Sequence, residues 1–223
     1  MAVFLVDYEN VSGSNGLLGI EYLNSSDKLI IFFSQCCAKI RADQMKVIKQ
    51  SGCGFSVHKL LRTSKNGLDF YIAAECGGLV QRGEKELVIV SNDKGYDAVL
   101  DYFKTNELYV ENAPDMARAS NIEKGILALH GVHDKKRRED IIKNVATLDL
   151  TVAYDGYKAD LEYQQKIEQA LQGTECADMT ERVLELVCSQ KNAPRKVIYI
   201  GALRSFGREQ GRAVYRLVRD LVG

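Results

Sequence analysis

The sequence predicts an α/β fold: a parallel five-stranded sheet, sandwiched by helices, followed by a small all-helical C-terminal module. Three observations lead to this prediction. Short apolar runs alternate with longer helical patterns over residues 1–130. The short runs are apolar throughout, as is typical of strands buried on both faces. Beyond residue 138 only helical patterns recur, so the architecture changes there.

Five segments have the length and the β-branched or aromatic content of strands, and they lie at residues 3–6, 28–33, 54–60, 86–90 and 107–110. Helical patterns separate or follow them at residues 38–50, 66–80, 93–104 and 115–129. Right-handed crossovers place such helices on both faces of a parallel sheet. We expect the doubly wound strand order 3-2-1-4-5.

A basic stretch at residues 131–138 interrupts the alternation. We therefore expect a domain over residues 1–130, a linker over 131–138 and a helical module over 139–223. Helices of this module are expected at residues 139–148, 155–171, 180–190, 196–203 and 208–222.

Composition excludes several classes of protein. With 46% hydrophobic and 27% charged residues, the 223-residue chain is neither disordered nor of low complexity. No apolar run approaches the ~20 residues of a membrane span, and no signal-peptide pattern opens the chain. Six cysteines without a Cys-x-x-Cys pair fit a reducing compartment, so we expect a cytoplasmic protein without a membrane partner.

The formal net charge is zero, because 30 basic residues balance 30 acidic ones. This balance argues against a protein that binds polyanions over its whole surface. It does not exclude local patches of either sign.

Acidic residues follow two strands that the predicted order makes neighbours. Asp7 follows the first strand and Asp93 the fourth, at the edge where ligands bind in such sheets. Asp97 lies four residues after Asp93, on the same side of its helix. Asp69 interrupts an otherwise apolar helix near its start. Carboxylates that converge in one crevice repel one another, and a hard cation such as Mg²⁺ or Mn²⁺ relieves that repulsion.

Each acid also has a structural interpretation. Asp93 suits a helix N-cap, Asp69 a first turn that favours negative charge, and Asp7 a turn. What favours a joint site is that three separate segments each bring an acid to the same predicted edge.

Three motifs together resemble the PIN-like nuclease superfamily, close to its NYN-related bacterial branches. They are Leu5-Val6-Asp7-Tyr8-Glu9-Asn10-Val11, Lys65-Asn66-Gly67-Leu68-Asp69-Phe70 and Ile89-Val90-Ser91-Asn92-Asp93-Lys94-Gly95-Tyr96-Asp97. The resemblance implies a Mg²⁺- or Mn²⁺-dependent ribonuclease, with Asp7, Asp69, Asp93 and Asp97 as the catalytic, metal-binding acids. The fourth acid varies in position within the superfamily, so Glu9 and Asp97 are rival candidates. Asn10 and Ser91 match supporting positions of the motifs.

Metal ions held by such carboxylates activate water for attack on phosphorus. We therefore expect an endoribonuclease that leaves 5′-phosphate and 3′-hydroxyl ends, with DNA as a less favoured substrate. Lys94 is a candidate phosphate contact, and Lys65 a weaker one. Some PIN-like domains have lost cleavage, so the alternative is an inactive nucleic-acid-binding or protein-interaction module. A bacterial toxin or defence nuclease would share these features.

The last helix has a basic face, because Arg208, Arg212, Arg216 and Arg219 recur at helical spacing. Arginine suits phosphate, which makes this helix a candidate nucleic-acid contact. The competing interpretation is a solvated face that pairs with residues 155–185, where eight acids outnumber three bases. The C-terminal helices are also candidate contacts for a second copy or another protein.

Overall fold

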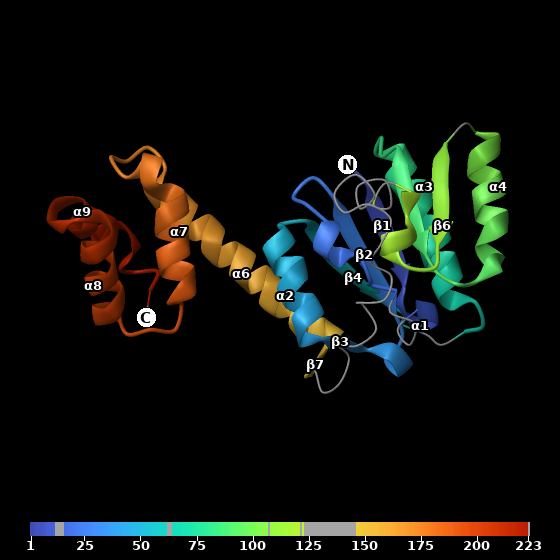
Figure 1. Cartoon of the computed structure of the whole chain (residues 1–223), viewed down its shortest axis with the longest axis horizontal. Helices are drawn as coiled ribbons and strands as arrows, with labels where there is room; N and C mark the ends of the chain where they lie inside the picture. The colour runs from blue at the N-terminus through green and yellow to red at the C-terminus, as the bar shows by residue number, and fades with distance from the viewer. Residues whose placement is uncertain (12–15, 62–63, 107, 121, 123–145, 223) are drawn as a thin grey trace, which may run out of the picture. The chain divides into compact units, whose positions relative to one another are not determined.

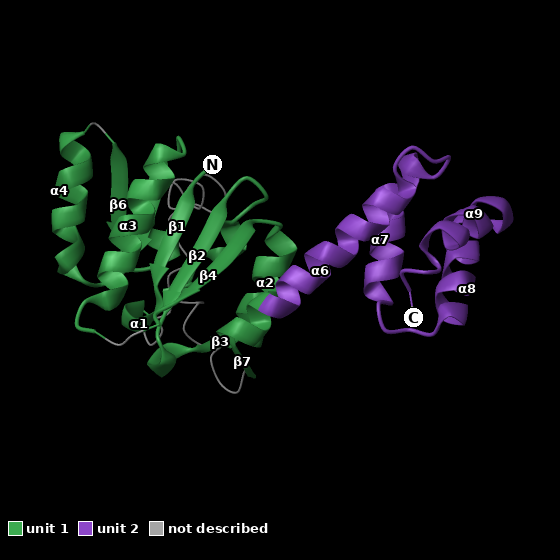
Figure 2. Cartoon of the chain, turned by 180° about the vertical axis from the view of Figure 1, so that it is seen from behind, with its two compact units in different colours: residues 1–154 green, residues 155–223 purple. Residues whose placement is uncertain are grey.

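A computed structural model describes residues 1–11, 16–61, 64–106, 108–120, 122 and 146–222 (Figure 1). The chain divides into two compact units, Met1–Tyr154 and Asp155–Gly223 (Figure 2). Each unit is described by itself below.

The first unit is built on a five-stranded sheet in which every neighbouring pair is parallel. Its strands are β1 (Val3–Asp7), β2 (Lys28–Phe33), β4 (Gly54–Lys59), β5 (Glu86–Val90) and β6 (Tyr109–Ala113). This confirms the predicted α/β class. The order by label is β4-β2-β1-β5-β6 rather than 3-2-1-4-5. The labels shift because an unpredicted strand, β3, precedes β4 in the chain, whereas the five predicted segments lie beside the neighbours expected for them.

The register sets the position of the acidic edge. In the central strand β1, Val6 pairs with Ile31 of β2 on one side and with Val90 of β5 on the other. Asp7 and Ser91 each follow these paired residues directly. The ends of β1 and β5 therefore place both side chains at one edge of the sheet. This is the edge at which ligands bind in doubly wound sheets.

Both faces of the sheet are buried. On one face Leu5, Phe32 and Ile89 pack in a common cluster with α3 (Gly67–Gln81) and with Phe103 of α4 (Asp97–Thr105). The alternate residues, such as Phe4 and Ile31, are at most 1% exposed as well. Burial on both faces explains why these strands are apolar throughout.

A second, two-stranded sheet corrects two helix predictions. The helix expected at 38–50 is α2 (Ala42–Ser51), and residues before it form β3 (Lys39–Arg41). The antiparallel partner of β3 is β7 (Thr147–Asp149), which replaces the end of the helix expected at 139–148. Each strand has only three residues and depends on a partner more than 100 positions away, so no local pattern reveals it.

Two further segments differ from the prediction. The helix expected from residue 93 begins at Asp97, because Asp93 instead caps a preceding 3₁₀ turn, η4 (Lys94–Tyr96). Where a helix was expected at 115–129, the structure has the 3₁₀ turn η5 (Met116–Arg118), and residues 123–129 lie outside the described part. The remaining short helical segments in the described part of this unit are α1 (Tyr8–Val11), η2 (Ile20–Tyr22) and η3 (Gln35–Cys37).

The second unit is helical. It contains the C-terminal part of α6 (Leu150–Leu171), which begins in the first unit, then η6 (Ala177–Met179), α7 (Thr180–Ser189), α8 (Arg195–Phe206) and α9 (Arg208–Val218). Its core is a separate cluster that includes Leu171, Val187, Ile198 and Val214. This unit begins at 155 rather than at the expected 139, because residues 147–149 pair with β3. The expected linker 131–138 lies outside the described residues.

All six cysteines have free thiols. No helix in the described part of the chain has both the length and the apolar character that a membrane span requires.

Candidate active site

The candidate site is centred on Asp7, the last residue of the central strand. Its side chain is only 4% exposed. One carboxylate oxygen, Oδ2, accepts hydrogen bonds from the Ser91 hydroxyl and the Tyr96 hydroxyl, each at 3.2 Å. The other, Oδ1, accepts the Asn10 backbone N–H at 3.3 Å. The strand end thus holds a buried carboxylate in a fixed orientation.

Tyr96 joins Asp7 to a second carboxylate. Its hydroxyl oxygen also lies 3.0 Å from Oδ1 of Asp69, in the first turn of α3. Tyr96 is 1% exposed, whereas Asp69 is partly exposed. A phenol carries one proton, so it can donate to only one of these two carboxylates at a time. Three separate segments therefore meet at one hydroxyl group.

Electrostatics disfavour two full negative charges at this point. Burial is the main cause that raises the pKa of Asp7, and the neighbouring charge of Asp69 raises it further. Hydrogen bonds from Asn10, Ser91 and Tyr96 oppose the shift without cancelling it. Burial and both carboxylates raise the pKa of Tyr96, which keeps its hydroxyl a neutral donor.

Asp93 lies next to this group but turns its carboxylate to its own loop. Its Oδ1 accepts the Gly95 backbone N–H at 2.7 Å, which is the capping role considered from the sequence. Its backbone N–H donates to the Ser91 hydroxyl at 3.1 Å. Asn10 of α1 also contacts this loop, since its Oδ1 accepts the Asn92 N–H at 2.9 Å. Asn10 and Ser91 thus hold the ends of β1 and β5 together.

The other predicted site residues lie on the surface. Glu9, Lys65, Lys94 and Asp97 are exposed, Asp97 as the first residue of α4. Within the described ranges, no three side chains of His, Cys, Asp or Glu lie close enough together to hold one metal ion. Of the four predicted acids, the structure brings together Asp7 and Asp69.

This donor set suits a hard divalent cation. Mg²⁺ prefers oxygen ligands, keeps several waters, and commonly uses only one or two protein carboxylates together with substrate phosphates. Asp7 and Asp69 supply two carboxylates at one edge, and their mutual repulsion is what a cation relieves. Their chemistry therefore fits Mg²⁺ or Mn²⁺, with water completing the coordination.

Tyr96 is the residue that sequence reasoning missed. Tyr96 ends the 3₁₀ turn η4, directly before α4, and it is buried as a core residue would be. Its place between Asp93 and Asp97 could have indicated a role in the site. A buried phenol normally finds a hydrogen-bond partner, and acids of the site were the nearby candidates. Here the partners are the two acids.

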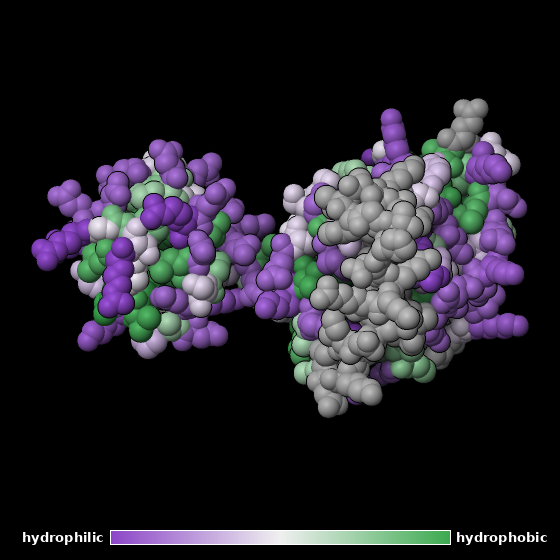
Figure 3. Space-filling model, viewed as in Figure 1, coloured by the Kyte–Doolittle hydropathy of each residue, from purple (hydrophilic) through white to green (hydrophobic). Residues whose placement is uncertain are grey.

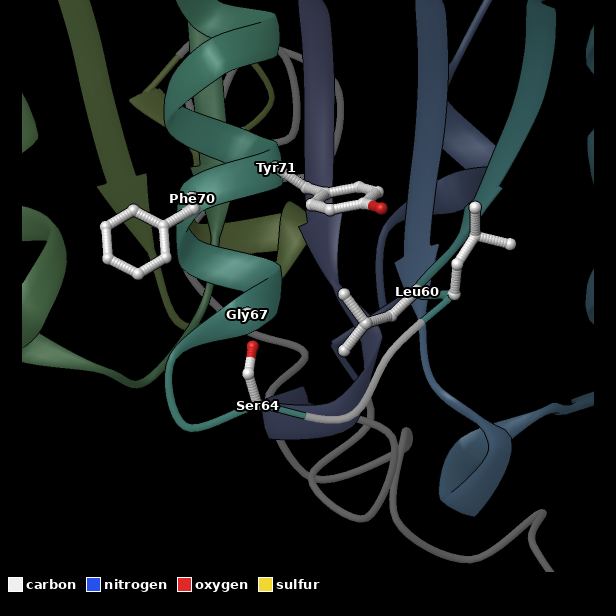
Figure 4. Close-up of a pocket in the computed structure, with 6 residues that line it drawn as sticks. Leu60, Ser64, Gly67, Phe70 and Tyr71 are labelled. Atoms are coloured by element: carbon white, nitrogen blue, oxygen red, sulfur yellow. The ribbon is translucent and has the colours of Figure 1, made fainter.

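A separate hollow of about 320 Å³ lies beside the first turn of α3. In Figure 4 the ring of Tyr71 extends to the Leu60 side of the helix, whereas Phe70 points away on the other side. Phe70 is 71% exposed and Leu61 84%. The hollow is lined by Leu60, Leu61, Ser64, Gly67, Phe70 and Tyr71, none of which is acidic.

The four predicted arginines lie in the second unit. Arg208, Arg212 and Arg216 belong to α9, and Arg219 is its C-cap. All four are exposed.

Comparison with known proteins identifies a family for the first unit. A sequence model of the PIN domain family matches residues 1–113, which contain the sheet, α3, α4 and every residue of the acidic site. Searches of curated proteins and of solved structures gave no significant match. The family match confirms the resemblance to PIN-like nucleases, whereas the NYN-related branch stays a prediction. PIN domains are generally nucleases that need a divalent metal, and this chain belongs to the PIN domain family.

Proposed function

We propose that this protein is a Mg²⁺- or Mn²⁺-dependent endoribonuclease that leaves 5′-phosphate and 3′-hydroxyl ends. The observation that carries the proposal is the contact of Asp7 and Asp69 through Tyr96, at the strand edge of a PIN domain. A bound divalent ion supplies the activation of water and the charge neutralisation that phosphodiester hydrolysis needs.

The residues of the chain divide this work. Asp7 and Asp69 hold the ion, and Asp93 with either Asp97 or Glu9 completes the acidic set. Ser91 and Asn10 orient Asp7 through the hydrogen bonds described above. Lys94, exposed next to Asp93, contacts a substrate phosphate. The six free thiols support a cytoplasmic site of action, and a toxin or defence role fits such an enzyme.

A second candidate is an inactive PIN domain that binds nucleic acid or another protein. One observation favours it: in the described residues only two acids come together, and no three-donor group is formed. The two candidates differ in whether RNA is cut and in whether a cation binds.

Cleavage is tested on labelled single-stranded RNA and on DNA of the same sequence, with Mn²⁺, Mg²⁺ or EDTA. We expect cutting of RNA in preference to DNA, dependence on the metal, and loss of at least ~100-fold in rate for Asp7→Asn and Asp69→Asn, since each removes a ligand of the activating ion. Asp101→Asn, an exposed acid of α4, is the matched control and should cut normally. Equal cutting by all three variants would show that the activity does not come from this site.

Thermal unfolding with added Mn²⁺ separates the two candidates without a substrate. A ligand that binds only the native state stabilises it by RT ln(1 + [L]/Kd), about 2.7 kcal/mol at one hundred times Kd. We expect Mn²⁺ to stabilise the protein and its Asp101→Asn variant, but not Asp69→Asn. No stabilisation of the unmodified chain at millimolar Mn²⁺ would favour the inactive domain.

A further inference from the structure

The C-terminal helix carries four exposed arginines on one side. Arg208, Arg212, Arg216 and Arg219 are spaced by four, four and three residues, which keeps them on one narrow strip of the helix. We call these four residues the arginine face. At 1.5 Å per residue, the face extends over roughly 17 Å of helix.

The other side of α9 anchors it to its unit. Gly211, Val214 and Val218 are buried, and both valines belong to the core cluster of the second unit. Gly211 lies so close to α8 that a Cβ there would be 2.5 Å from the backbone oxygen of Ala202. The helix is therefore held rigidly, with its arginines directed to solvent.

In the part of the chain that the structure describes, acidic residues neutralise little of the arginine face. Within the described residues, the one ion pair of the face joins Arg219 to the adjacent Asp220 at 3.3 Å. The acidic stretch 155–185 has ion pairs of its own, between Lys158 and Asp155 and between Lys191 and Asp160. The interpretation that this stretch pairs with the arginines thus finds no support in the described contacts.

Helix α8, which packs against α9, carries exposed basic residues too. Lys196 and Arg204 are exposed as well, whereas Glu209 is the one acid in α9 itself. On the face of the second unit seen in Figure 3, hydrophilic side chains predominate, with smaller hydrophobic areas between them. The four residues of the arginine face, with Lys196 and Arg204, are all exposed, so positive charge is available to a partner.

From this arrangement we infer that the arginine face binds the phosphate backbone of RNA, without reading its sequence. A guanidinium presents a planar fork that matches phosphate oxygens, and phosphate contacts dominate sequence-independent affinity. A rigid row of such groups with little internal neutralisation is complementary to a polyanion. This binding goes beyond the proposed cleavage, because it needs neither the acidic site nor a metal ion.

The inference predicts how strongly the affinity for RNA depends on salt concentration. Each phosphate contact with a single strand contributes about −0.7 to the slope of log K against log salt. Four arginine contacts thus give a slope of about −3, and loss of two contacts reduces its magnitude by about 1.4.

The test is fluorescence anisotropy of a labelled single-stranded RNA with the full chain in EDTA. Binding is measured at several salt concentrations from roughly 50 to 200 mM, the range over which phosphate contacts change the affinity strongly. Arg212→Glu with Arg216→Glu should weaken binding about tenfold or more and flatten the slope as calculated. The matched control, Lys158→Glu with Lys166→Glu, makes the same charge change on α6 and should leave the slope nearly unchanged. Arg212→Lys with Arg216→Lys keeps the charge and should retain most of the affinity.

Each other outcome overturns the inference. Equal weakening by the arginine and α6 variants would show a diffuse charge effect. Unchanged RNA binding together with an altered oligomeric state would assign the face to a second copy or another protein. Circular dichroism of each variant shows whether it is folded. Because EDTA prevents metal-dependent cleavage, failure here leaves the nuclease proposal untouched, and failure of cleavage leaves this inference untouched.

Discussion

The fold disfavours the negatively charged form of the Asp7 carboxylate. It is 4% exposed, its pKa is raised by burial, and Asp69 adds a like charge through the shared contact with Tyr96. Residues arranged for function commonly reduce stability in this way. In the absence of a cation, the charge on Asp7 should therefore weaken the protein.

Replacing Asp7 by Asn tests this cost through its pH dependence. Because the folded pKa lies above the ordinary value of 3.8, Asp7 destabilises the fold increasingly as pH rises from 3.8 through the folded pKa. Asp7→Asn should consequently be more stable than the unmodified chain at pH 7 in EDTA, and the difference should vanish below the ordinary value. Urea unfolding at several pH values measures this difference in the free energy of unfolding. A difference that is independent of pH would contradict the argument.

Tyr96 gives a second prediction at the same scale. Tyr96→Phe keeps the buried ring but removes the hydroxyl between Asp7 and Asp69. Since a hydrogen bond to a charged group contributes about 1.5–3 kcal/mol, we expect a comparable loss in free energy of unfolding, measured in EDTA.

The matched control for Tyr96→Phe is Tyr102→Phe, whose ring is 66% exposed. It should change the free energy of unfolding by less than about 0.5 kcal/mol. Equal stability of the Tyr96 and Tyr102 variants would mean that the shared hydroxyl does not hold the two carboxylates.

Helices α8 and α9 meet through a glycine, and this contact can be tested at the scale of the element. In Gly211→Ala the new Cβ would lie 2.5 Å from the Ala202 carbonyl oxygen and 2.8 Å from Cα of Leu203, both backbone atoms that cannot yield. Overpacking costs about 1–3 kcal/mol, and over most of that range the cost exceeds the ~1 kcal/mol that alanine contributes to a helix.

We expect Gly211→Ala to be destabilised in thermal or urea unfolding. The control is Gly156→Ala in α6, where no atom lies within 4 Å of the added Cβ, and it should be slightly more stable than the unmodified chain. A stabilised Gly211→Ala would show that the two helices pack less closely than described.

Elements with a strong local signal were predictable. The strand at Lys28–Phe33 and the strand at Glu86–Val90 match their predicted ranges, because short β-branched and aromatic runs favour a buried strand. β3 and β7 were not predictable, since their three residues gain order only from each other. The start of α4 was misplaced because a capping aspartate serves a 3₁₀ turn as well as an α-helix.

The candidate site was predictable to the extent that topology determines it. The predicted strand order makes β1 and β5 neighbours, so Asp7 and the segment of Asp93 were expected at one edge, whereas the hydrogen bond of Asp7 with Ser91 was not predicted. Side-chain orientation was not predictable: Asp93 bonds within its own loop, and Tyr96 reaches both acids. The hydrogen-bond partners of these side chains depend on distances of a few ångströms, which residue spacing in the sequence does not specify.

At the scale of the whole molecule, a net charge of zero conceals separated charges of opposite sign. The acidic pair lies in the first unit, and the arginine face lies in the second. A protein with this distribution can attract a cation at one place and a polyanion at another.

The two units also have separate hydrophobic cores, which share no residue in the described chain. Two cores predict two unfolding transitions rather than one. Leu79 lies in the core of the first unit and Leu171 in that of the second, and each is at most 2% exposed. Leu79→Ala and Leu171→Ala should each lower the stability of one unit by about 2–5 kcal/mol, as buried leucine truncations do.

Calorimetry with Mn²⁺ then assigns the metal to a unit. The ion should raise only the transition that Leu79→Ala lowers, because a ligand stabilises only the cooperative unit that binds it. Leu171→Ala should move the other transition, which Mn²⁺ leaves in place. A single transition that both variants and Mn²⁺ shift together would mean that the chain unfolds as one cooperative body, whereas a Mn²⁺ effect on the helical unit would place the cation away from Asp7 and Asp69.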